Sequence, residues 1–446
     1  MQLKTQPMTA RFLFLAVLLM LPAAYAQRPG HGAPGTYALV DCRIETITNG
    51  TIESGSIIVR DGRIEAVGPG VSAPSDARVI PCDGHTVYPG FIEGGTKIGL
   101  MEIGALGETT DFREIGAVTP HMQAISAINP TSIHIPIARV NGVTTVLSTP
   151  NGGVIPGTAA LIQLHGYTPQ QMDLGFRGVI VDFPSAARRG RFDQRSEDDR
   201  QKQAKEQRDE LNRIMDQAVL FARIEASRGQ QQMPEYVPQM EALLPVIRGQ
   251  APLLIEVNGA QDILDAIAWV EERNVRAVLM GVIEGWRVAD RIAAAGIPVV
   301  AGPVHAIPLR ESERYDRPYA NAGLLYAAGV QVALRTTSLG MSDTHNTRNL
   351  PFHAGFAAAY GEANGYGRQQ ALESVTIEAA RIFGVDAELG SIEVGKRATF
   401  FFADGDPFET ATQLTRLFID GYDVPLVSKQ TQLYDEYIIR TPGLSK

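Results

Sequence analysis

The chain has few cysteines and few histidines. Its 446 residues include two cysteines, Cys42 and Cys82, and eight histidines. Two cysteines alone do not make a structural zinc site, which usually takes four Cys or His ligands. The pair leaves two alternatives open, a disulfide in an oxidising compartment or two buried free thiols. The sequence does not decide between them, because the bond depends on a Cα separation that sequence does not supply.

Clustered positive charge and long apolar runs are also lacking. The chain has 40 Lys and Arg against 49 Asp and Glu, a net charge of −9, so nucleic-acid binding is not expected as its main task. After the N-terminal region no segment is long and apolar enough to span a bilayer, which takes about 20 residues. A hydrophobic content of 44% and a charged content of 20% are typical of a globular protein.

The N-terminus has the pattern of a targeting segment. A lysine and an arginine precede the short apolar run Phe12–Leu21, which leads to Ala24-Tyr25-Ala26. A basic start, an apolar centre and an Ala-x-Ala site are typical of a cleaved secretory signal. We therefore predict a signal peptide at residues 1–26, a flexible Gly- and Pro-rich leader at 27–36, and a periplasmic or secreted mature protein without a membrane span.

Short alternating runs at both ends of the chain predict strands. Asp-Gly steps at Asp61-Gly62 and Asp83-Gly84 separate such runs, and this is a strong hairpin signal. A similar run, Gly390–Phe402, stands near the far end of the chain. We predict one small β-sandwich built from residues 37–90 and 388–430.

Between these ends, strand-like and helix-like runs alternate. This order predicts a parallel sheet covered by helices, and residues 91–387 exceed the roughly 250 residues that a closed eightfold barrel needs. The expected strands are Asn141–Leu147, Leu161–Leu164, Gly178–Asp182, Leu253–Val257, Ala277–Met280, Ile297–Ala301 and Val330–Leu334.

A charged segment near 188–228 departs from this rhythm. It predicts a long helical insertion whose first half is solvated and whose second half packs through apolar residues at helical spacing. Its mixed charges favour a solvent-facing surface over a nucleic-acid or membrane patch, with a lid or partner-binding element as the alternative. The expected packed residues are Leu211, Ile214, Ala218, Phe221 and Ile224.

Several motifs carry a family resemblance. Val87-Tyr-Pro-Gly-Phe-Ile92 opens the central region, and the far end reads Gly390-Ser-Ile-Glu-x-Gly-Lys-x-Ala398, Asp404-Gly-Asp-Pro407 and Phe418-Ile-Asp-Gly421. In order and spacing these motifs resemble the amidohydrolase superfamily, with imidazolonepropionase-like secreted relatives, over residues 37–424. The resemblance implies an α/β fold, a (β/α)8 TIM-type barrel with a small β-sandwich formed from both chain ends. It also implies a hydrolase of non-peptide carbon–nitrogen bonds that uses zinc or another divalent metal.

The metal ligands of that superfamily are replaced in this chain. The resemblance implies His-x-His after the first strand, histidines after the fifth and sixth, an aspartate after the eighth, and a carboxylated lysine or glutamate after the fourth. An ammonium group has no lone pair for a metal, so we expect neither metal nor another cofactor. The fourth-strand position falls within Val181–Pro184, and the other positions hold, in order, Gly95, Lys97, Glu256, Gly281 and Thr337.

The substitutions suggest a replacement for the metal. We predict an internal Lys97–Glu256 ion pair with Arg335 adding positive charge nearby, because buried charges must pair. The alternative is that these side chains diverge into solvent. A His305–His345 pair is a weaker metal candidate, since no carboxylate spacing supports it.

Two function classes remain open, and no catalytic residue is assigned. One is an exported hydrolase of non-peptide carbon–nitrogen bonds that works without the metal centre. The other is a degenerate relative, a pseudoenzyme that binds a small molecule at the barrel mouth or serves as the partner subunit of an active paralogue. A homo-oligomer is compatible with both, and the sequence does not name a substrate.

Overall fold

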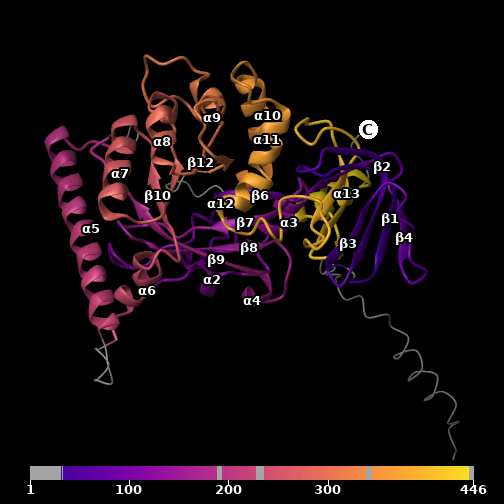
Figure 1. Cartoon of the computed structure of the whole chain (residues 1–446), viewed down its shortest axis with the longest axis horizontal. Helices are drawn as coiled ribbons and strands as arrows, with labels where there is room; N and C mark the ends of the chain where they lie inside the picture. The colour runs from indigo at the N-terminus through magenta and orange to yellow at the C-terminus, as the bar shows by residue number, and fades with distance from the viewer. Residues whose placement is uncertain (1–31, 33, 188–192, 228–235, 338–343, 441–446) are drawn as a thin grey trace, which may run out of the picture.

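A computed structural model describes residue 32 and residues 34–187, 193–227, 236–337 and 344–440. A β-sheet unit lies at one end of the long axis, and a barrel with its helices fills the rest (Figure 1). The predicted signal peptide at 1–26 and part of the predicted leader at 27–36 lie outside the described residues.

The larger unit is an eight-stranded barrel that is nearly closed. Its strands neighbour one another in chain order, from β6 to β13, which confirms the predicted barrel. The strands are β6 (Phe91–Thr96), β7 (Val143–Ser148), β8 (Gly157–Gln163), β9 (Asp173–Asp182), β10 (Leu253–Val257), β11 (Ala277–Gly281), β12 (Val299–Ala301) and β13 (Val332–Leu334).

One strand departs from the parallel pattern expected from sequence. β8 pairs antiparallel with both β7 and β9, whereas the other neighbouring strands of the barrel are parallel. Only residues 149–156 connect β7 to β8. A parallel connection needs a crossover of about a dozen or more residues, so this short link returns the chain in the opposite direction.

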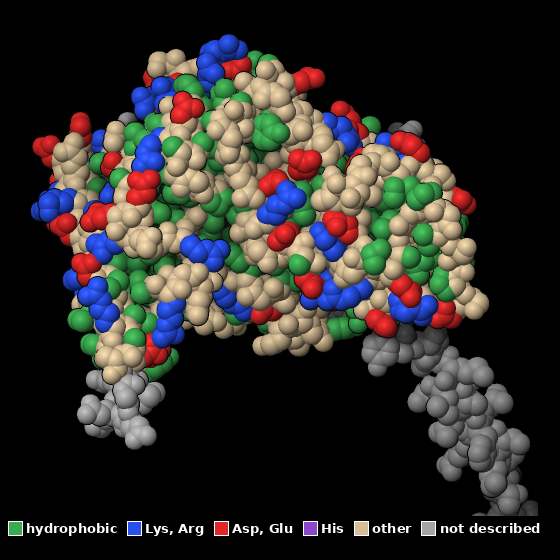
Figure 2. Space-filling model, in the orientation of Figure 1, with side chains coloured by type: hydrophobic (Ala, Val, Ile, Leu, Met, Phe, Trp, Pro, Cys, Tyr) green, Lys and Arg blue, Asp and Glu red, His purple; other side chains and the backbone are tan. Residues whose placement is uncertain are grey.

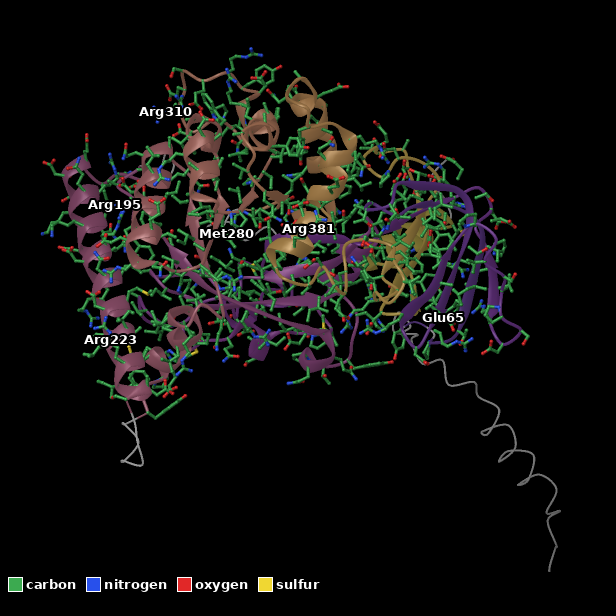
Figure 3. The ribbon with its side chains drawn as sticks, in the orientation of Figure 1. Glu65, Arg195, Arg223, Met280, Arg310 and Arg381 are labelled. Atoms are coloured by element: carbon green, nitrogen blue, oxygen red, sulfur yellow. A yellow bond between two sulfur atoms is a disulfide. The ribbon has the colours of Figure 1, made fainter. Side chains whose placement is uncertain are left out.

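Alternating residues of the strands fill the barrel interior. Successive side chains of a strand point to opposite faces, so one set packs inward and the other meets the helices. The inward set forms a single apolar cluster, as in other barrels of this architecture, where the interior is a packed core. It includes Ile92, Leu147, Ala159, Leu161, Ile180, Leu254, Val278, Met280, Val300 and Ala333. Figure 3 places Met280 near the middle of the molecule.

Helices cover the barrel and fill the connections. The α-helices are α2 (Ala124–Ala127), α3 (His134–Arg139), α4 (Pro169–Met172), α5 (Glu197–Ala226), α6 (Pro238–Ile247), α7 (Ala260–Arg273), α8 (Ala289–Ala295), α9 (Arg317–Ala327), α10 (Leu350–Gly361), α11 (Arg368–Ser374), α12 (Ile377–Ile382) and α13 (Lys429–Ile438). Short 3-10 turns are η1 (Gly107–Thr109), η2 (Gly285–Arg287), η3 (Thr344–Asn349) and η4 (Glu362–Asn364).

The charged insertion forms the 30-residue helix α5, which stands at the end of the molecule opposite the β-sheet unit (Figure 1). The Ser196 hydroxyl accepts from the backbone N–H of Asp199, and three acidic residues in the first turn complement the helix dipole. The second half packs on the core through Leu211, Ile214, Met215, Ala218 and Phe221. Ile224, expected in this set, is instead 47% exposed in the last turn.

The smaller unit joins both chain ends, as predicted, but in one hydrogen-bonded sheet where the sequence predicts a small β-sandwich. Its strand order is β16-β15-β14-β5-β1-β2-β3, with β4 pairing β1. The strands are β1 (Tyr37–Glu45), β2 (Thr51–Arg60), β3 (Arg63–Gly68), β4 (Arg78–Pro81), β5 (Thr86–Pro89), β14 (Phe400–Ala403), β15 (Leu414–Ile419) and β16 (Tyr422–Val424). Of the two alternatives for the cysteines, the structure has the bridge, with the Cα atoms of Cys42 and Cys82 5.0 Å apart.

Gly90 is the single residue that connects the smaller sheet to the barrel. Gly90 separates β5 from β6, and a Cβ atom there would come within 2.1 Å of the Thr144 hydroxyl on β7. Tyr88 on β5 stacks on Phe401 of β14, with ring centroids 5.7 Å apart. A glycine is therefore needed at residue 90, where the chain passes from the sheet into the barrel.

The visible surface mixes both signs of charge. Figure 2 shows Lys and Arg side chains interspersed with Asp and Glu over the helices, as the composition predicts for a solvated surface. Within the described ranges, no helix combines the length and the apolar character needed to cross a bilayer.

Candidate functional site at the barrel mouth

Two charged side chains lie directly above the apolar barrel interior. Glu256 is two residues beyond Leu254 on β10, and Arg335 is two residues beyond Ala333 on β13. Because side chains two apart share a face of a strand, both point inward at the carboxyl ends of the strands. In barrels of this type the chemistry is carried at that end, so the two residues mark the candidate site.

Arg335 and Glu256 form a bidentate ion pair. Arg335 Nη1 donates to Glu256 Oε2 at 2.8 Å, and Arg335 Nη2 donates to Oε1 at 2.5 Å. The exposed fractions of the two side chains are 3% and 8%. A guanidinium matches a carboxylate with two parallel hydrogen bonds, and this geometry offsets much of the cost of removing both charges from water.

Glycines provide the space for this pair. At Gly281 a Cβ atom would lie 2.9 Å from Arg335 Nη2 and 3.0 Å from Glu256 Oε1, and at Gly302 it would lie 2.2 Å from the Arg335 carbonyl oxygen. At Gly95 the nearest neighbour would be Arg335 Cδ, at 3.5 Å. The guanidinium thus lies against two of the positions at which the resemblance implies metal-binding histidines.

The predicted Lys97–Glu256 ion pair is wrong, because the cation that pairs with Glu256 is Arg335. Among the described residues the ion pair of Glu256 is with Arg335, and none joins Glu256 to Lys97. Lys97 follows the end of β6 and accepts a backbone hydrogen bond from Leu100. Its side chain is buried and its Nζ lies 4.6 Å from the centroid of the Phe112 ring, so it is directed to the loop after β6.

Thr337 holds two strand ends together. Its buried hydroxyl donates to the Gly95 carbonyl oxygen at 2.8 Å, which ties the segment after β13 to β6. Thr337 stands at the aspartate position of the resemblance, and here its hydroxyl makes a structural contact at the seam of the barrel, where β6 and β13 meet.

Glu93, which the sequence reasoning missed, lies at the same seam. It is fully buried on β6 and accepts from the Thr336 backbone N–H at 3.0 Å, the Thr336 hydroxyl at 2.9 Å and the Gly95 N–H at 3.3 Å. Burial raises the pKa of Glu93 to about 7, and these hydrogen bonds oppose the rise. The sequence signal was available, because Glu93 stands where the superfamily motif Pro-Gly-Phe-Ile-Asp has its acidic residue.

Asn258 is a second site residue that sequence reasoning did not single out. It follows β10, and its Oδ1 atom is enclosed without a hydrogen-bond partner among the described residues. The same atom would lie 2.4 Å from a Cβ atom at Gly281, which places it beside the ion pair. A buried acceptor without a donor is costly, and a ligand N–H group would satisfy it.

The fourth-strand region contributes one carboxylate. Within Val181–Pro184 the acidic residue is Asp182, the last residue of β9. The next residue, Phe183, donates its backbone N–H to the Glu256 carbonyl oxygen at 3.1 Å. Asp182 and Glu256 therefore end neighbouring strands.

The proposed His305–His345 pair does not form. His305 packs on His353, with ring centroids 4.1 Å apart, whereas His345 is exposed on the surface. The Val304 backbone N–H donates to His353 Nδ1 at 3.3 Å. Burial, with a smaller effect of His305, lowers the pKa of His353 to about 3, so this imidazole is neutral at pH 7.

The residues at the mouth do not fit the divalent metal that the resemblance implies. A divalent metal binds neutral or anionic donors that carry a lone pair, and the Arg335 guanidinium at the mouth is a cation without one. Gly95 and Gly281 have no side-chain donor, and the described ranges contain no group of three His, Cys, Asp or Glu side chains placed to hold an ion.

Known proteins similar to this chain share its architecture. Residues 87–427 match the profile of the Amidohydrolase family. An imidazolonepropionase from Symbiobacterium thermophilum is 26% identical over 381 residues, 78% of this chain and 83% of that relative. An amidohydrolase from Thermotoga maritima superposes with a TM-score of 0.76 at 24% identity, covering 87% of this chain and 99% of the other. An adenosine deaminase from Xanthomonas campestris with bound zinc gives a TM-score of 0.51 at 16% identity, covering 91% and 97%.

The buried ion pair predicts a large asymmetry between single and double substitutions. Arg335→Met leaves the Glu256 carboxylate enclosed without its partner and should cost about 3–5 kcal/mol of unfolding free energy. Adding Glu256→Gln should recover more than half of that loss. Chemical denaturation measures both. The matched control is Arg60→Met, which breaks exposed pairs with Asp76 and Glu65 and should cost far less than Arg335→Met. A cost for Arg335→Met no larger than the control would contradict a buried pair.

Glu93 predicts a pH dependence of stability. Its folded pKa of about 7 exceeds the ordinary value of 4.5, so its contribution is complete below pH 4.5 and is lost as the pH rises through 7. Glu93→Gln mimics the protonated carboxyl, since its amide can donate to the Thr336 hydroxyl. Between pH 4.5 and pH 8, the unfolding free energy of Glu93→Gln minus that of the wild type should rise by about 3 kcal/mol, as measured by chemical denaturation. The exposed Glu65→Gln serves as control, and parallel curves for wild type and Glu93→Gln would contradict the assignment.

Proposed function

Because this chain belongs to the amidohydrolase family, we propose that it is a member that binds a small molecule and holds no metal. The family resemblance by itself indicates a hydrolase of carbon–nitrogen bonds. In the proposed binding role the barrel mouth holds a small polar molecule and does not activate a water through a metal. The observation that carries the proposal is the Arg335–Glu256 pair, whose guanidinium lies against Gly95 and Gly281.

The charge balance of the mouth supports the proposal. A divalent ion placed beside Glu256 would meet the Arg335 guanidinium already bonded to that carboxylate. Binding the ion would require breaking two hydrogen bonds and moving a cation whose side chain is 3% exposed. Repulsion between like charges at short range in a low-dielectric site amounts to several kcal/mol, so the pair disfavours the metal directly.

Asn258 supports the binding of a small molecule. Its enclosed Oδ1 atom lies next to the ion pair and offers an acceptor to a ligand N–H group. A site built to pair such a group discriminates against ligands that lack it, because they leave the acceptor unsatisfied. The ligand class proposed is therefore a small molecule with an amide-like N–H.

A metal measurement tests this function. The chain is produced in zinc-supplemented medium, purified, and analysed by plasma mass spectrometry beside the zinc-bound Xanthomonas campestris deaminase as a positive control. We expect far less than one metal ion per chain, an unfolding temperature that a chelator leaves unchanged, and no chelator-sensitive hydrolysis of an amide panel. One zinc per chain, with a chelator lowering the unfolding temperature, would contradict the proposal.

We also propose that the protein is exported. The basic start, the run Phe12–Leu21 and Ala24-Tyr25-Ala26 support a cleaved signal, and the Cys42–Cys82 bridge suits an oxidising compartment. N-terminal sequencing of the protein from a periplasmic or extracellular fraction should begin near Gln27. An uncleaved chain in the cytoplasm would contradict export.

A further inference from the structure

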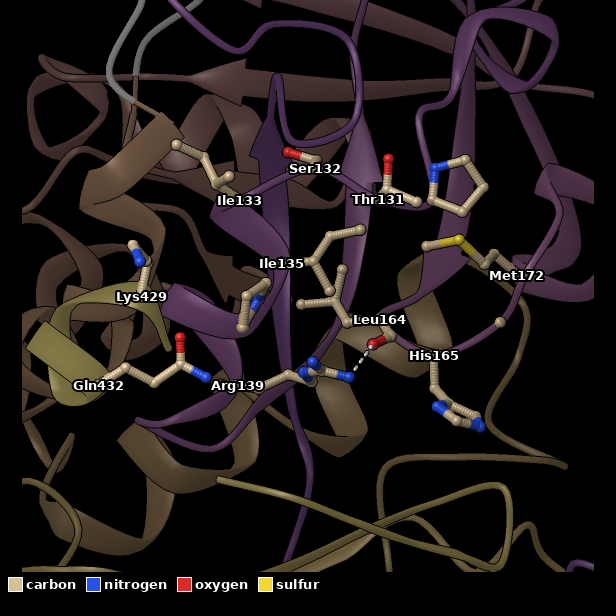
Figure 4. A pocket seen from close by; sticks show the side chains of 13 residues that line it. Thr131, Ser132, Ile133, Ile135, Arg139, Leu164, His165, Met172, Lys429 and Gln432 are labelled. Atoms are coloured by element: carbon tan, nitrogen blue, oxygen red, sulfur yellow. Dashed lines mark hydrogen bonds between the residues drawn. The ribbon is translucent and has the colours of Figure 1, made fainter. Parts of the chain in front are cut away.

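A second candidate site lies at the opposite end of the barrel from the mouth. A cavity of about 440 Å³, open to solvent on one side, is lined by α3, the segment after β8 and the helix α13 (Figure 4). Leu164, which lines it, donates its backbone N–H to the Thr144 carbonyl oxygen near the start of β7. The cavity is therefore at the amino-terminal end of the parallel strands.

Arg139 brings a cation without a counter-ion to this cavity. Its Nη1 donates to the Leu164 carbonyl oxygen at 3.3 Å, while its enclosed Nε atom makes no hydrogen bond. No carboxylate among the described residues forms an ion pair with it, in contrast to Arg335 at the mouth. Burial lowers the pKa of Arg139 to about 10, so the group is still charged at pH 7. A largely buried arginine is almost always paired, and this one is paired only with a carbonyl group.

The facing wall adds a second cation and polar groups. Lys429 and Gln432 lie three residues apart on α13, on the same helix face, and both line the cavity. Figure 4 shows them to one side of the Arg139 guanidinium, with His165 on the other side. No acidic residue lines the cavity. The charged side chains that line the cavity are therefore all positive.

Apolar side chains complete the lining. Ile133, Ile135, Leu164 and Met172 surround the space next to the guanidinium. Pockets of about 300–1,000 Å³ with mostly apolar walls and a few polar groups hold small organic molecules. A free phosphate or chloride would use the cations but leave these side chains without a contact.

We propose that this cavity binds a small organic acid, with its carboxylate on Arg139 and its apolar body against Ile135, Leu164 and Met172. The carboxylate supplies the counter-ion that Arg139 lacks, through a charge-assisted hydrogen bond to Nη2, since the Nε atom is enclosed. Lys429 lies at the opening and adds a second positive charge.

Such a ligand would also join α13 to the barrel. In the structure α13 has no buried residue, so its packing contributes little by itself. A molecule held between Arg139 on α3 and Lys429 on α13 contacts both helices at once. Because a ligand that binds only the folded state stabilises it, occupancy should raise the unfolding temperature.

Binding of hexanoate to the full mature chain tests the proposal. Hexanoate, neutral hexanamide and inorganic phosphate are titrated by calorimetry, with the unfolding temperature followed in parallel. We expect saturable binding of hexanoate, at least about tenfold weaker binding of hexanamide, and at least about tenfold loss of hexanoate affinity in Arg139→Met, since each change removes the charge-assisted contact. Lys429→Met, at an exposed helix position, should weaken hexanoate binding without affecting folding.

The control variant is Arg381→Met, which removes an exposed arginine outside the cavity and should leave hexanoate affinity unchanged. Absence of saturable hexanoate binding in the wild type would overturn the proposal. Equal affinity for hexanoate and hexanamide would do the same, and so would phosphate binding tighter than hexanoate. If Arg139→Met fails to fold, the hexanamide comparison and Lys429→Met still decide the outcome.

Discussion

The buried ion pair between Arg335 and Glu256 is the constraint on which the barrel mouth depends. Two charges can remain in this dry space only while they bond to each other, because each alone would cost several kcal/mol. The pair fixes the positions of two strand ends, β10 and β13. It also requires the absence of a side chain at Gly281, where a Cβ atom would crowd both paired groups, while Gly302 leaves room for the Arg335 carbonyl group. The local sequence is therefore adapted to a guanidinium where related barrels are expected to hold a metal.

The seam of the barrel relies on side chains near the same place. β6 and β13 are the two ends of the hydrogen-bonded strand order, so no ladder closes the barrel between them. Instead, Glu93 accepts hydrogen bonds from Thr336, and Thr337 donates to the Gly95 carbonyl oxygen. Closure of the barrel and geometry of the mouth are thus coupled, since Arg335 immediately precedes these two threonines.

Sequence reasoning located the strands because each is a short apolar run with clear boundaries. It also identified Glu256 and Arg335 as mouth residues, because Glu256 stands at the fifth-strand histidine position of the resemblance and Arg335 directly follows the run Val330–Leu334. It could not identify the cation that pairs with Glu256, since Lys97 and Arg335 both follow strands and only the loop after β6 turns Lys97 toward Phe112. The antiparallel direction of β8 could not be predicted, because an apolar run does not show which way the strand will point in the sheet. Glu93 was overlooked although the acidic position of the family motif marks it, because its hydrogen-bond partner Thr336 is distant in sequence.

We propose that the guanidinium of Arg335 occupies the place of a metal. The most direct measurement is a crystal structure of the zinc-soaked protein, with anomalous diffraction data collected at the zinc edge. We expect Arg335 to remain bonded to both Glu256 oxygens and no anomalous peak to lie within the barrel mouth. A peak at bonding distance from Glu256, with the guanidinium displaced, would contradict it.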